Sequence, residues 1–377
     1  MIRDFSIWEY DAYHKLWDIC IVGAGINGLS AGISLLERIP DLKILILDRW
    51  FIPLGASTRN AGFACFGSPS EVIDDIAHLG EQNASELVQK RWRGLQLLKK
   101  RLEGSNARYE SYGGYELYTK NKFDEVGSSL PYLNTLLGEL IGQDNIYEEI
   151  NVPAGIRGFS HAVYNPYEGQ LHAGFMIEHL KEMFLSLGGK IYTGVTIEQV
   201  EEKSDHIVLS NSLSIPFEAK KVIISVNAFA ASLFPDLDVH GVRNHVFVTS
   251  PLKGLSWKGC FHYDKGFYYF RNIGERILLG GARNKDFEKE NTETFGRNPV
   301  IVEELNRFLY QHLASKENVQ IDYEWSGIMA FGADKLPIVK AVSSRIYLGL
   351  RCSGMGIALA SLIGEELADL ICNSQVD

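Results

Sequence analysis

The sequence predicts an α/β fold in which a parallel sheet covered by helices is joined to a second, α+β domain whose sheet is mainly antiparallel. Three observations predict it: the first 50 residues read as strand, helix and strand, the end of the chain reads as strand, turn and helix, and short alternating strands dominate between them. At roughly 150 residues per domain, a chain of 377 residues can form two or three domains with cores of their own.

The composition is that of a folded protein, with 46% apolar and 22% charged residues. A net charge of −10 repels phosphate backbones, so nucleic acid is a poor partner and a small-molecule substrate is expected. Five scattered cysteines without a CxxC pair indicate neither a disulfide framework nor a zinc site. No stretch is apolar over the ~18 residues that a membrane span needs, so we expect a soluble, cytoplasmic protein.

A first βαβ unit occupies residues 18–48. The apolar run at 18–22 ends in glycines, and apolar residues at helical spacing follow at 29–37. Pro40 stops this helix, and the apolar run at 43–48 is typical of a parallel strand that is buried on both faces.

The middle of the chain begins with a glycine-rich polar stretch at 55–70 and a segment of helical spacing at 85–102. Alternating segments, read as strands, follow at 115–118, 190–192, 207–209, 222–225, 246–249, 266–271 and 276–279. A strand at 346–350, a glycine-rich turn and a helix at 357–371 close the chain. The two ends are therefore alike in architecture, as expected if one domain is assembled from separated segments.

The turn between the first strand and the first helix has the sequence Gly23-Ala24-Gly25-Ile26-Asn27-Gly28. In a Rossmann-like domain such glycines permit the tight turn, let the backbone approach a diphosphate and pack the helix on the strand. Asp48, at the end of the second strand, can accept hydrogen bonds from the adenosine ribose, and the helix N-terminus favours the diphosphate. Because an aspartate there disfavours a 2′-phosphate, the residues indicate FAD or NAD in preference to NADP.

Further segments extend this pattern along nearly the whole chain. They lie at 55–63 (GASTRNAGF), 168–172, 225–228, 242–243, 268–271, 280–283, 325–327 with Asp334 and Pro337, and 353–357. In this order the segments resemble the D-amino-acid-oxidase-like family of FAD oxidoreductases, which includes glycine, sarcosine and γ-glutamylputrescine oxidases. We therefore expect two interleaved domains. The FAD-binding domain would comprise residues 1–85, 160–232 and 320–377, and the substrate domain residues 86–159 and 233–319.

The resemblance implies that the cofactor is FAD. In the family, the residues that match the 57–63 loop line the pyrophosphate and the edge of the isoalloxazine, and the residue that matches Ile197 meets the adenine. Residues 353–357 match a loop and helix N-terminus whose dipole stabilises the negative charge of the reduced flavin. The expected cofactor-binding residues are Gly23, Gly25, Ile26, Asn27, Gly28, Asp48, Arg49, Ser57, Thr58, Arg59, Asn60, Ala61, Gly62, Phe63, Ile197, Asn227, Arg351, Ser353, Gly354, Met355, Gly356 and Ile357. We expect FAD to be bound without a covalent link, because residues 330–333 lack the cysteine that attaches it in sarcosine-oxidase-like relatives and no histidine follows the 57–60 loop.

The reaction implied by the resemblance is oxidation of an amine or amino acid. A hydride passes from Cα to flavin N5, dioxygen accepts the electrons, and hydrogen peroxide forms. No protein nucleophile is needed, so the protein orients the substrate and excludes water. Tyr268 and Tyr269 alternate along one strand, so only one of them can face the pocket, and the resemblance favours Tyr268.

The chain departs from the family at Met329. Amino-acid oxidases of the family carry an arginine two residues after the glycine of the Trp-x-Gly segment, and its two parallel hydrogen bonds hold the substrate carboxylate. Either the substrate has no carboxylate near the reacting carbon, or Arg351, Arg283 or Arg59 replaces that arginine. The candidate catalytic residues are thus Tyr268, Arg351, Arg283 and Met329, and the expected substrate is an amine, or an amino acid with a remote carboxylate, in preference to glycine or sarcosine.

Two other functions stay open at this point. One is a flavin dehydrogenase of a 2-hydroxy acid or secondary amine that passes electrons to a quinone or carrier protein, and the other is a flavin-binding module without turnover. His240 and His245 have no acidic neighbour in the sequence, so no metal site is predicted. His262 and Cys65 could reach the pocket, yet single residues of these types are usually structural.

Overall fold

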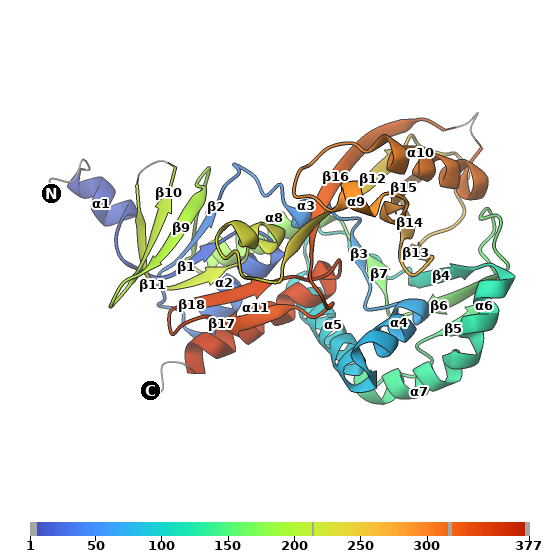
Figure 1. Cartoon of the computed structure of the whole chain (residues 1–377), viewed down its shortest axis with the longest axis horizontal. Helices are drawn as coiled ribbons and strands as arrows, with labels where there is room; N and C mark the ends of the chain where they lie inside the picture. Colours follow the sequence, from blue (N-terminus) through green and yellow to red (C-terminus); the bar gives the residue numbers. More distant parts are fainter. Residues whose placement is uncertain (1–5, 213–214, 316–318, 374–377) are drawn as a thin grey trace.

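The computed structural model describes residues 6–212, 215–315 and 319–373, which form two eight-stranded sheets side by side (Figure 1). The first sheet contains β1 (Trp17–Val22), β2 (Ile44–Asp48), β8 (Lys190–Thr193), β9 (Ile197–Glu202), β10 (Ile207–Asn211), β11 (Phe217–Ile224), β17 (Ile338–Ala341) and β18 (Ile346–Leu350). Its order is β17-β18-β11-β1-β2-β8, and β10 joins β11 to β9. The strands from β18 to β8 are parallel, and the others pair antiparallel.

Helices cover one face of the first sheet, and they come from distant parts of the chain. These helices are α2 (Ile26–Arg38), α5 (Glu81–Arg101), α8 (Ala173–Ser186) and α11 (Gly356–Asn373). Leu29, Leu95, Leu180 and Ile363 belong to their shared core. A Cβ on Gly364 of α11 would lie 2.5 Å from the backbone of Ser30 in α2, so glycine lets the two helices cross closely.

The second sheet is mainly antiparallel and has the order β16-β12-β15-β14-β13-β4-β6-β5. Its strands are β4 (Gly114–Tyr118), β5 (Glu148–Ile150), β6 (His161–Asn165), β12 (His240–Thr249), β13 (Cys260–Tyr263), β14 (Tyr268–Ile273), β15 (Arg276–Gly281) and β16 (Ile321–Phe331). Only β13 and β4 pair in parallel in this sheet. Its core includes Phe261, Phe270 and Phe308, the last of which lies in α10 (Pro299–Phe308).

The remaining elements lie outside the two eight-stranded sheets. They are α1 (Ile7–Tyr13), α3 (Ala56–Arg59), β3 (Phe63–Ala64), α4 (Pro69–Leu79), α6 (Lys120–Val126), η1 (Gly127–Ser129), α7 (Leu130–Ile141), β7 (Gly169–Gln170), η2 (Asn227–Ser232), η3 (Arg283–Lys285), α9 (Phe287–Glu290) and η4 (Leu309–Leu313). β3 and β7 form a separate two-stranded ladder. α3 and β3 lie in the stretch for which the sequence predicted only irregular structure.

The predicted α/β fold is confirmed, and the strand and helix at each end of the chain lie where the sequence placed them. The expected domains and the two sheets differ at two strands, because β6 and β16 pair within the second sheet although 160–232 and 320–377 were assigned to the FAD-binding domain. α5 also departs from the expected division, because it packs on α11 and shares the core of that helix. Among the described residues, no helix is long and apolar enough to cross a membrane.

Candidate active site

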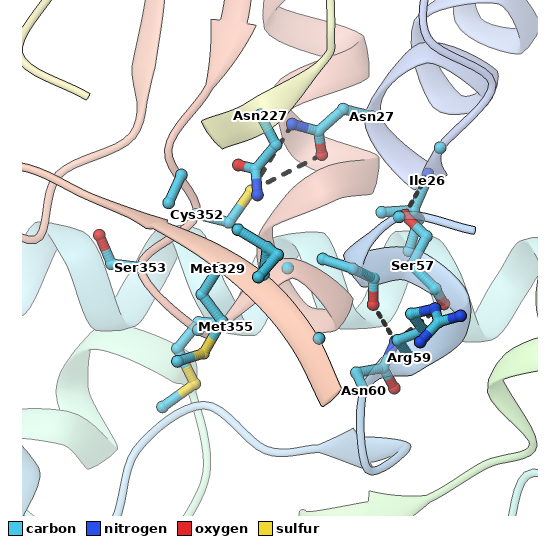
Figure 2. A pocket seen from close by; sticks show the side chains of 18 of the residues that line it. Ile26, Asn27, Ser57, Arg59, Asn60, Asn227, Met329, Cys352, Ser353 and Met355 are labelled. Atoms are coloured by element: carbon cyan, nitrogen blue, oxygen red, sulfur yellow. Dashed lines mark hydrogen bonds between the residues drawn. The ribbon is translucent and has the colours of Figure 1, made fainter. Parts of the chain in front are cut away.

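A cavity of about 610 Å³ lies between the two sheets and is lined by residues of both. Side chains from the glycine turn, from the loop around α3, from β16 and from the turn before α11 point toward one space (Figure 2). The carboxyl ends of β1, β2 and β18 meet at this edge of the first sheet, where α/β folds bind their ligands.

The dinucleotide end of the cavity is built by the glycine turn and Asp48. Gly23 has a φ of +110°, and a Cβ there would lie 2.6 Å from the carbonyl oxygen of Ser225, so only glycine fits. The carboxylate of Asp48 accepts backbone N–H groups from Ala24 at 2.8 Å and from Trp50 at 3.0 Å. Each oxygen keeps a lone pair for a ribose hydroxyl. Burial raises the pKa of Asp48, which the two N–H bonds oppose.

Hydrogen bonds fix the loop around α3 against α2. The hydroxyl of Ser57 accepts the backbone N–H of Ile26 at 3.0 Å, at the first turn of α2 (Figure 2). The amide of Asn60 donates to the carbonyl of Ser57 at 2.8 Å, and its oxygen accepts the N–H of Gly62 at 2.7 Å. Across the cavity, Asn27 donates to the carbonyl of Gly349 at 3.0 Å and thereby joins α2 to the end of β18.

Several buried polar atoms on the cavity wall have no protein partner. Within the described part of the chain these include the side-chain oxygens of Ser225, Asn227 and Ser353. Buried oxygens of this kind are normally hydrogen-bonded, so they indicate a polar ligand. A Cβ on Gly354, whose φ is +87°, would approach no atom closer than the sulfur of Met329 at 3.8 Å, which leaves the backbone open to the cavity. The residues present therefore fit a dinucleotide such as FAD.

Most of the cofactor residues predicted from the sequence line this cavity. They are Gly23, Gly25, Ile26, Asn27, Asp48, Arg49, Ser57, Arg59, Asn60, Ala61, Phe63, Ile197, Asn227, Ser353, Gly354, Met355, Gly356 and Ile357. Gly28, Thr58, Gly62 and Arg351 are not among the residues that line it.

Three of these four residues hold the segments that line the cavity in place. A Cβ on Gly28 would lie 2.0 Å from the carbonyl oxygen of Gly23, so Gly28 lets α2 pack on the turn. The hydroxyl of Thr58 donates to the carbonyl of Pro53 at 2.5 Å and is thus turned away. Gly62 has a φ of +73°, and a Cβ there would meet the carbonyl of Leu171 at 2.3 Å.

At the second sheet, Tyr269 faces the cavity, and the prediction that Tyr268 does so is wrong. The hydroxyl of Tyr268 donates to the carboxylate of Glu304, and its ring stacks on Phe308 at 4.7 Å, within the core on the opposite side of the sheet. Burial raises the pKa of Tyr269, so its hydroxyl stays protonated and can donate a hydrogen bond. Phe63 packs edge-on against Tyr269, with ring centroids 5.7 Å apart.

Arg283 lines the cavity beside aromatic rings and has no ion-pair partner among the described residues. Its guanidinium lies 4.8 Å from the ring centroid of Phe331 and 5.1 Å from that of Phe267. Burial lowers the pKa of Arg283, and the neighbouring Tyr269 opposes this change, yet a guanidinium remains charged. Met329 also lines the cavity, two residues before Phe331 on β16.

Arg351 is a structural residue at the start of the turn before α11, and the expectation that it points into the pocket or toward the flavin is wrong. Its guanidinium contacts Asp238 at 2.6 Å and Asp334 at 2.6 Å, and its Nε donates to the carbonyl of Leu336 at 2.9 Å. These contacts join the segment before β12 to the loop after β16. These contacts occupy the N–H groups of Arg351 with which it would otherwise bind a substrate carboxylate.

Arg351→Met should therefore destabilise the protein without emptying the cofactor site. The substitution removes two charged contacts whose aspartates are about half exposed, so we expect the free energy of unfolding to fall by about 2 kcal/mol. Urea unfolding together with the flavin-to-protein absorbance ratio measures both effects. Loss of flavin without loss of stability would instead place Arg351 at the cofactor.

The remaining charges on the cavity wall are mostly paired with one another. Lys335 contacts Asp75 at 2.6 Å, Lys265 contacts Asp74 at 2.7 Å, and Arg91 contacts Asp75 at 3.1 Å. Burial and these aspartates have opposite effects on Lys335, whose pKa is raised on balance. Arg283 thus differs from these three cations in having no carboxylate within ion-pair distance among the described residues. Arg59, which also lines the cavity, shares this property but donates to the carbonyl of Ser326 at 3.0 Å.

The sequence missed several cavity residues that come from separate segments. They are Trp50, Glu71, Asp74, Asp75, Arg91, Ser225, Phe229, Asn244, Lys265, Phe267, Tyr269, Phe331, Lys335 and Cys352. The sequence contained a signal for two of them: Ser225 belongs to the 225–228 segment, and the alternation of Tyr268 and Tyr269 indicated that one of these two faces the pocket. His245, which the sequence left without an acidic partner, lies 3.2 Å from the carboxylate of Glu290, whose pKa is lowered to about 2 by hydrogen bonds that outweigh its burial.

Known proteins are similar to this chain over most of its length. Gamma-glutamylputrescine oxidoreductase of Escherichia coli (strain K12) is 25% identical over 377 residues, which cover 94% of this chain and 83% of that protein. The probable oxidoreductase OrdL of Haemophilus influenzae is 23% identical over 378 residues, covering 94% and 82%. The crystal structure of glycine oxidase from Geobacillus kaustophilus superposes with a TM-score of 0.77 at 21% identity, covering 96% of this chain and 95% of that one.

The match to a family profile covers most of the chain. The profile is described as FAD dependent oxidoreductase (DAO), and it matches residues 18–370. This range includes the glycine turn, Asp48, both sheets and the turn before α11. The chain therefore belongs to the DAO family of FAD-dependent oxidoreductases and is related to its amine and amino-acid oxidoreductases.

Proposed function

We propose that this protein oxidises an amine that carries a carboxylate remote from the carbon that is oxidised. FAD, when bound, accepts a hydride from the carbon next to the nitrogen and passes the electrons to dioxygen, which gives hydrogen peroxide. The observation that carries the proposal is the guanidinium of Arg283, which has no ion-pair partner among the described residues. It lies in an aromatic chamber, formed by Phe63, Phe267, Tyr269 and Phe331, within the same cavity as the glycine turn and Asp48.

The position of Arg283 supports a remote carboxylate. Met329 replaces the arginine that holds the carboxylate of amino acids in family members, whereas Arg283 lies beside Phe331. Positions 329 and 331 share one face of β16 and are separated by about 7 Å, since a strand rises about 3.3 Å per residue. A carboxylate bound by Arg283 is thus displaced from the position next to the reacting carbon. The name of the E. coli relative is consistent with this, because γ-glutamylputrescine carries its carboxylate on the glutamyl group, at the other end from the free amine of its putrescine part.

Each residue of the chamber has a role in this proposal. Arg283 binds the carboxylate, the hydroxyl of Tyr269 donates a second hydrogen bond, and Met329 contacts the apolar chain of the substrate. The rings of Phe63, Phe267 and Phe331 exclude water and hold the substrate in one orientation. No nucleophile is required.

An assay under air tests the proposed acceptor. Amines with and without a remote carboxylate, together with glycine, sarcosine, D-alanine and D-proline, are incubated with the protein while oxygen uptake and hydrogen peroxide are measured. The proposal expects peroxide with the highest kcat/KM for a carboxylate-bearing amine. Highest kcat/KM for glycine or sarcosine would overturn the substrate assignment. Turnover of an artificial quinone without peroxide would indicate a dehydrogenase.

We also expect the FAD to be released by acid. Two cysteines line the cavity, but the sulfur of Cys352 is hydrogen-bonded to the amide of Asn27, and Cys65 is a buried thiol whose pKa is raised by burial. Neither is a ready nucleophile. After precipitation with trichloroacetic acid the yellow colour should remain in the supernatant. Colour in the pellet would contradict this, and Cys352→Ser and Cys65→Ser would then show which sulfur is attached.

A further inference from the structure

Three side chains with metal-binding atoms meet beside the cavity: Cys65, Glu168 and His262. One ligand atom of each lies within 4.8 Å of those of the other two. All three residues are buried, with exposed fractions of 3%, 2% and 7% respectively. The substrate and cofactor contacts proposed above use none of them, although Cys65 and His262 line the cavity.

Strand register brings the three residues together from distant segments. β3 pairs antiparallel with β7 and sets Ala64 opposite Gly169, so the next residues along, Cys65 and Glu168, face each other. The carboxylate of Glu168 reaches β4, where a Cβ on Gly114 would lie 1.8 Å from its Oε2. β13 pairs directly with β4 and supplies His262.

The imidazole of His262 supplies an independent sign of a ligand. Its Nε2 is buried and has no hydrogen-bond partner in the described part of the chain. Leaving such an atom without a partner costs free energy, so a group that binds it is expected.

We propose that Cys65, Glu168 and His262 bind one divalent metal ion of the zinc type. A thiolate, an imidazole and a carboxylate are the ligand set that Zn²⁺ prefers, and softer or harder ions suit only part of it. Binding forms a sulfur–metal bond and breaks the S–H bond of Cys65, so one proton is released to solvent. The two negative ligands balance the charge of the ion.

The surroundings hold the ligands in place and leave one side open. Glu168 is oriented by the backbone N–H groups of Phe66 at 2.8 Å and Gly67 at 3.2 Å, both of which bind its Oε1. The thiol of Cys260 lies next to the cluster but donates to the carbonyl of Gly169 at 3.1 Å, so it acts as a neighbour and not as a ligand. Three protein ligands with a free position toward a cavity resemble an open zinc site, which binds water or another small ligand.

Titration of the flavin-loaded protein with Co²⁺ tests the site independently of turnover. The protein is first dialysed against a chelator, and Co²⁺ is then added while the d–d absorption is followed at wavelengths longer than those at which flavin absorbs. Inductively coupled plasma mass spectrometry gives the stoichiometry, and Zn²⁺ is added in competition. We expect one ion per chain, displaced by Zn²⁺.

Variants show where the ion is bound. Cys65→Ser and His262→Gln should each weaken metal binding by about 100-fold or more. Loss of a residue that merely hydrogen-bonds to a metal ligand already lowers metal affinity by about 10- to 100-fold, and these substitutions remove a ligand itself. Cys372→Ser and His240→Gln, at sites outside the cavity, should bind as the wild type does. The absence of stoichiometric binding would overturn the proposal, and so would binding that His262→Gln retains, because it would mark an adventitious surface ion. Melting temperatures without metal identify a variant that fails to fold, and the other variant then decides.

Discussion

Gly25→Val is expected to give a folded protein that purifies almost without FAD. A Cβ at residue 25 would lie 3.0 Å from the hydroxyl of Ser57, and the γ carbons of valine would extend into the space where the backbone faces the diphosphate. We expect at least a tenfold loss of FAD affinity, equivalent to about 1.4 kcal/mol or more. The flavin-to-protein absorbance ratio and titration of the apoprotein with FAD measure this loss.

Two other glycines provide matched controls. Gly28→Ala should lower the melting temperature as well as the FAD content, because its Cβ would meet the backbone carbonyl of Gly23 at 2.0 Å and neither group can move freely. Gly174→Ala in α8 should change neither, since its closest contact is with the side chain of His172 at 3.3 Å. Normal FAD binding by Gly25→Val would show that the diphosphate does not lie at this turn.

Arg283→Met is expected to lower kcat/KM for a carboxylate-bearing amine by roughly 10- to 100-fold, since hydrogen bonds to a charged group are worth about 1.5–3 kcal/mol. Methionine keeps much of the side-chain length and removes the charge and all five donors. For the same amine with its carboxylate converted to an amide, the substitution should lower kcat/KM only slightly. Steady-state kinetics with this pair of substrates separates loss of a carboxylate contact from general damage to the site.

The two neighbouring tyrosines sharpen this test. Tyr269→Phe should lower kcat/KM for the carboxylate substrate by about tenfold, as expected for one hydrogen bond to a charged acceptor of about 1.5 kcal/mol. Tyr268→Phe should leave kcat/KM unchanged, because its hydroxyl contacts Glu304 outside the cavity. An equal effect of Arg283→Met on both substrates, or no effect on either, would contradict the role given to Arg283.

The dinucleotide end of the site could be predicted because its determinants are local. The glycine turn and Asp48 belong to one βαβ unit, and short-range geometry places their atoms together. The rest of the site depends on long-range pairing. Alternation showed that only one of Tyr268 and Tyr269 faces the cavity. Which of them does so depends on α10, because Phe308 of this helix stacks on Tyr268 at the other face of the sheet.

Two further features could not be read from sequence spacing. Arg351 is turned away by Asp238 and Asp334, which lie far from it along the chain, and nothing local marks them as its partners. Cys65, Glu168 and His262 are equally scattered, so no spacing of ligand residues along the chain indicates the metal site proposed above. The pairing of β16 with β12 could not be read from the sequence either, because a strand shows its own periodicity but not the strand with which it pairs.

Anaerobic titration of the purified yellow protein is the most direct test of an FAD-dependent amine oxidoreductase. The flavin absorbance is followed while amines and amino acids are added without oxygen, and air is then admitted. We expect full bleaching by a carboxylate-bearing amine and return of the colour in air with one hydrogen peroxide formed per flavin. A protein whose flavin no amine or amino acid bleaches, or one that purifies with NAD and no flavin, would contradict the proposed function.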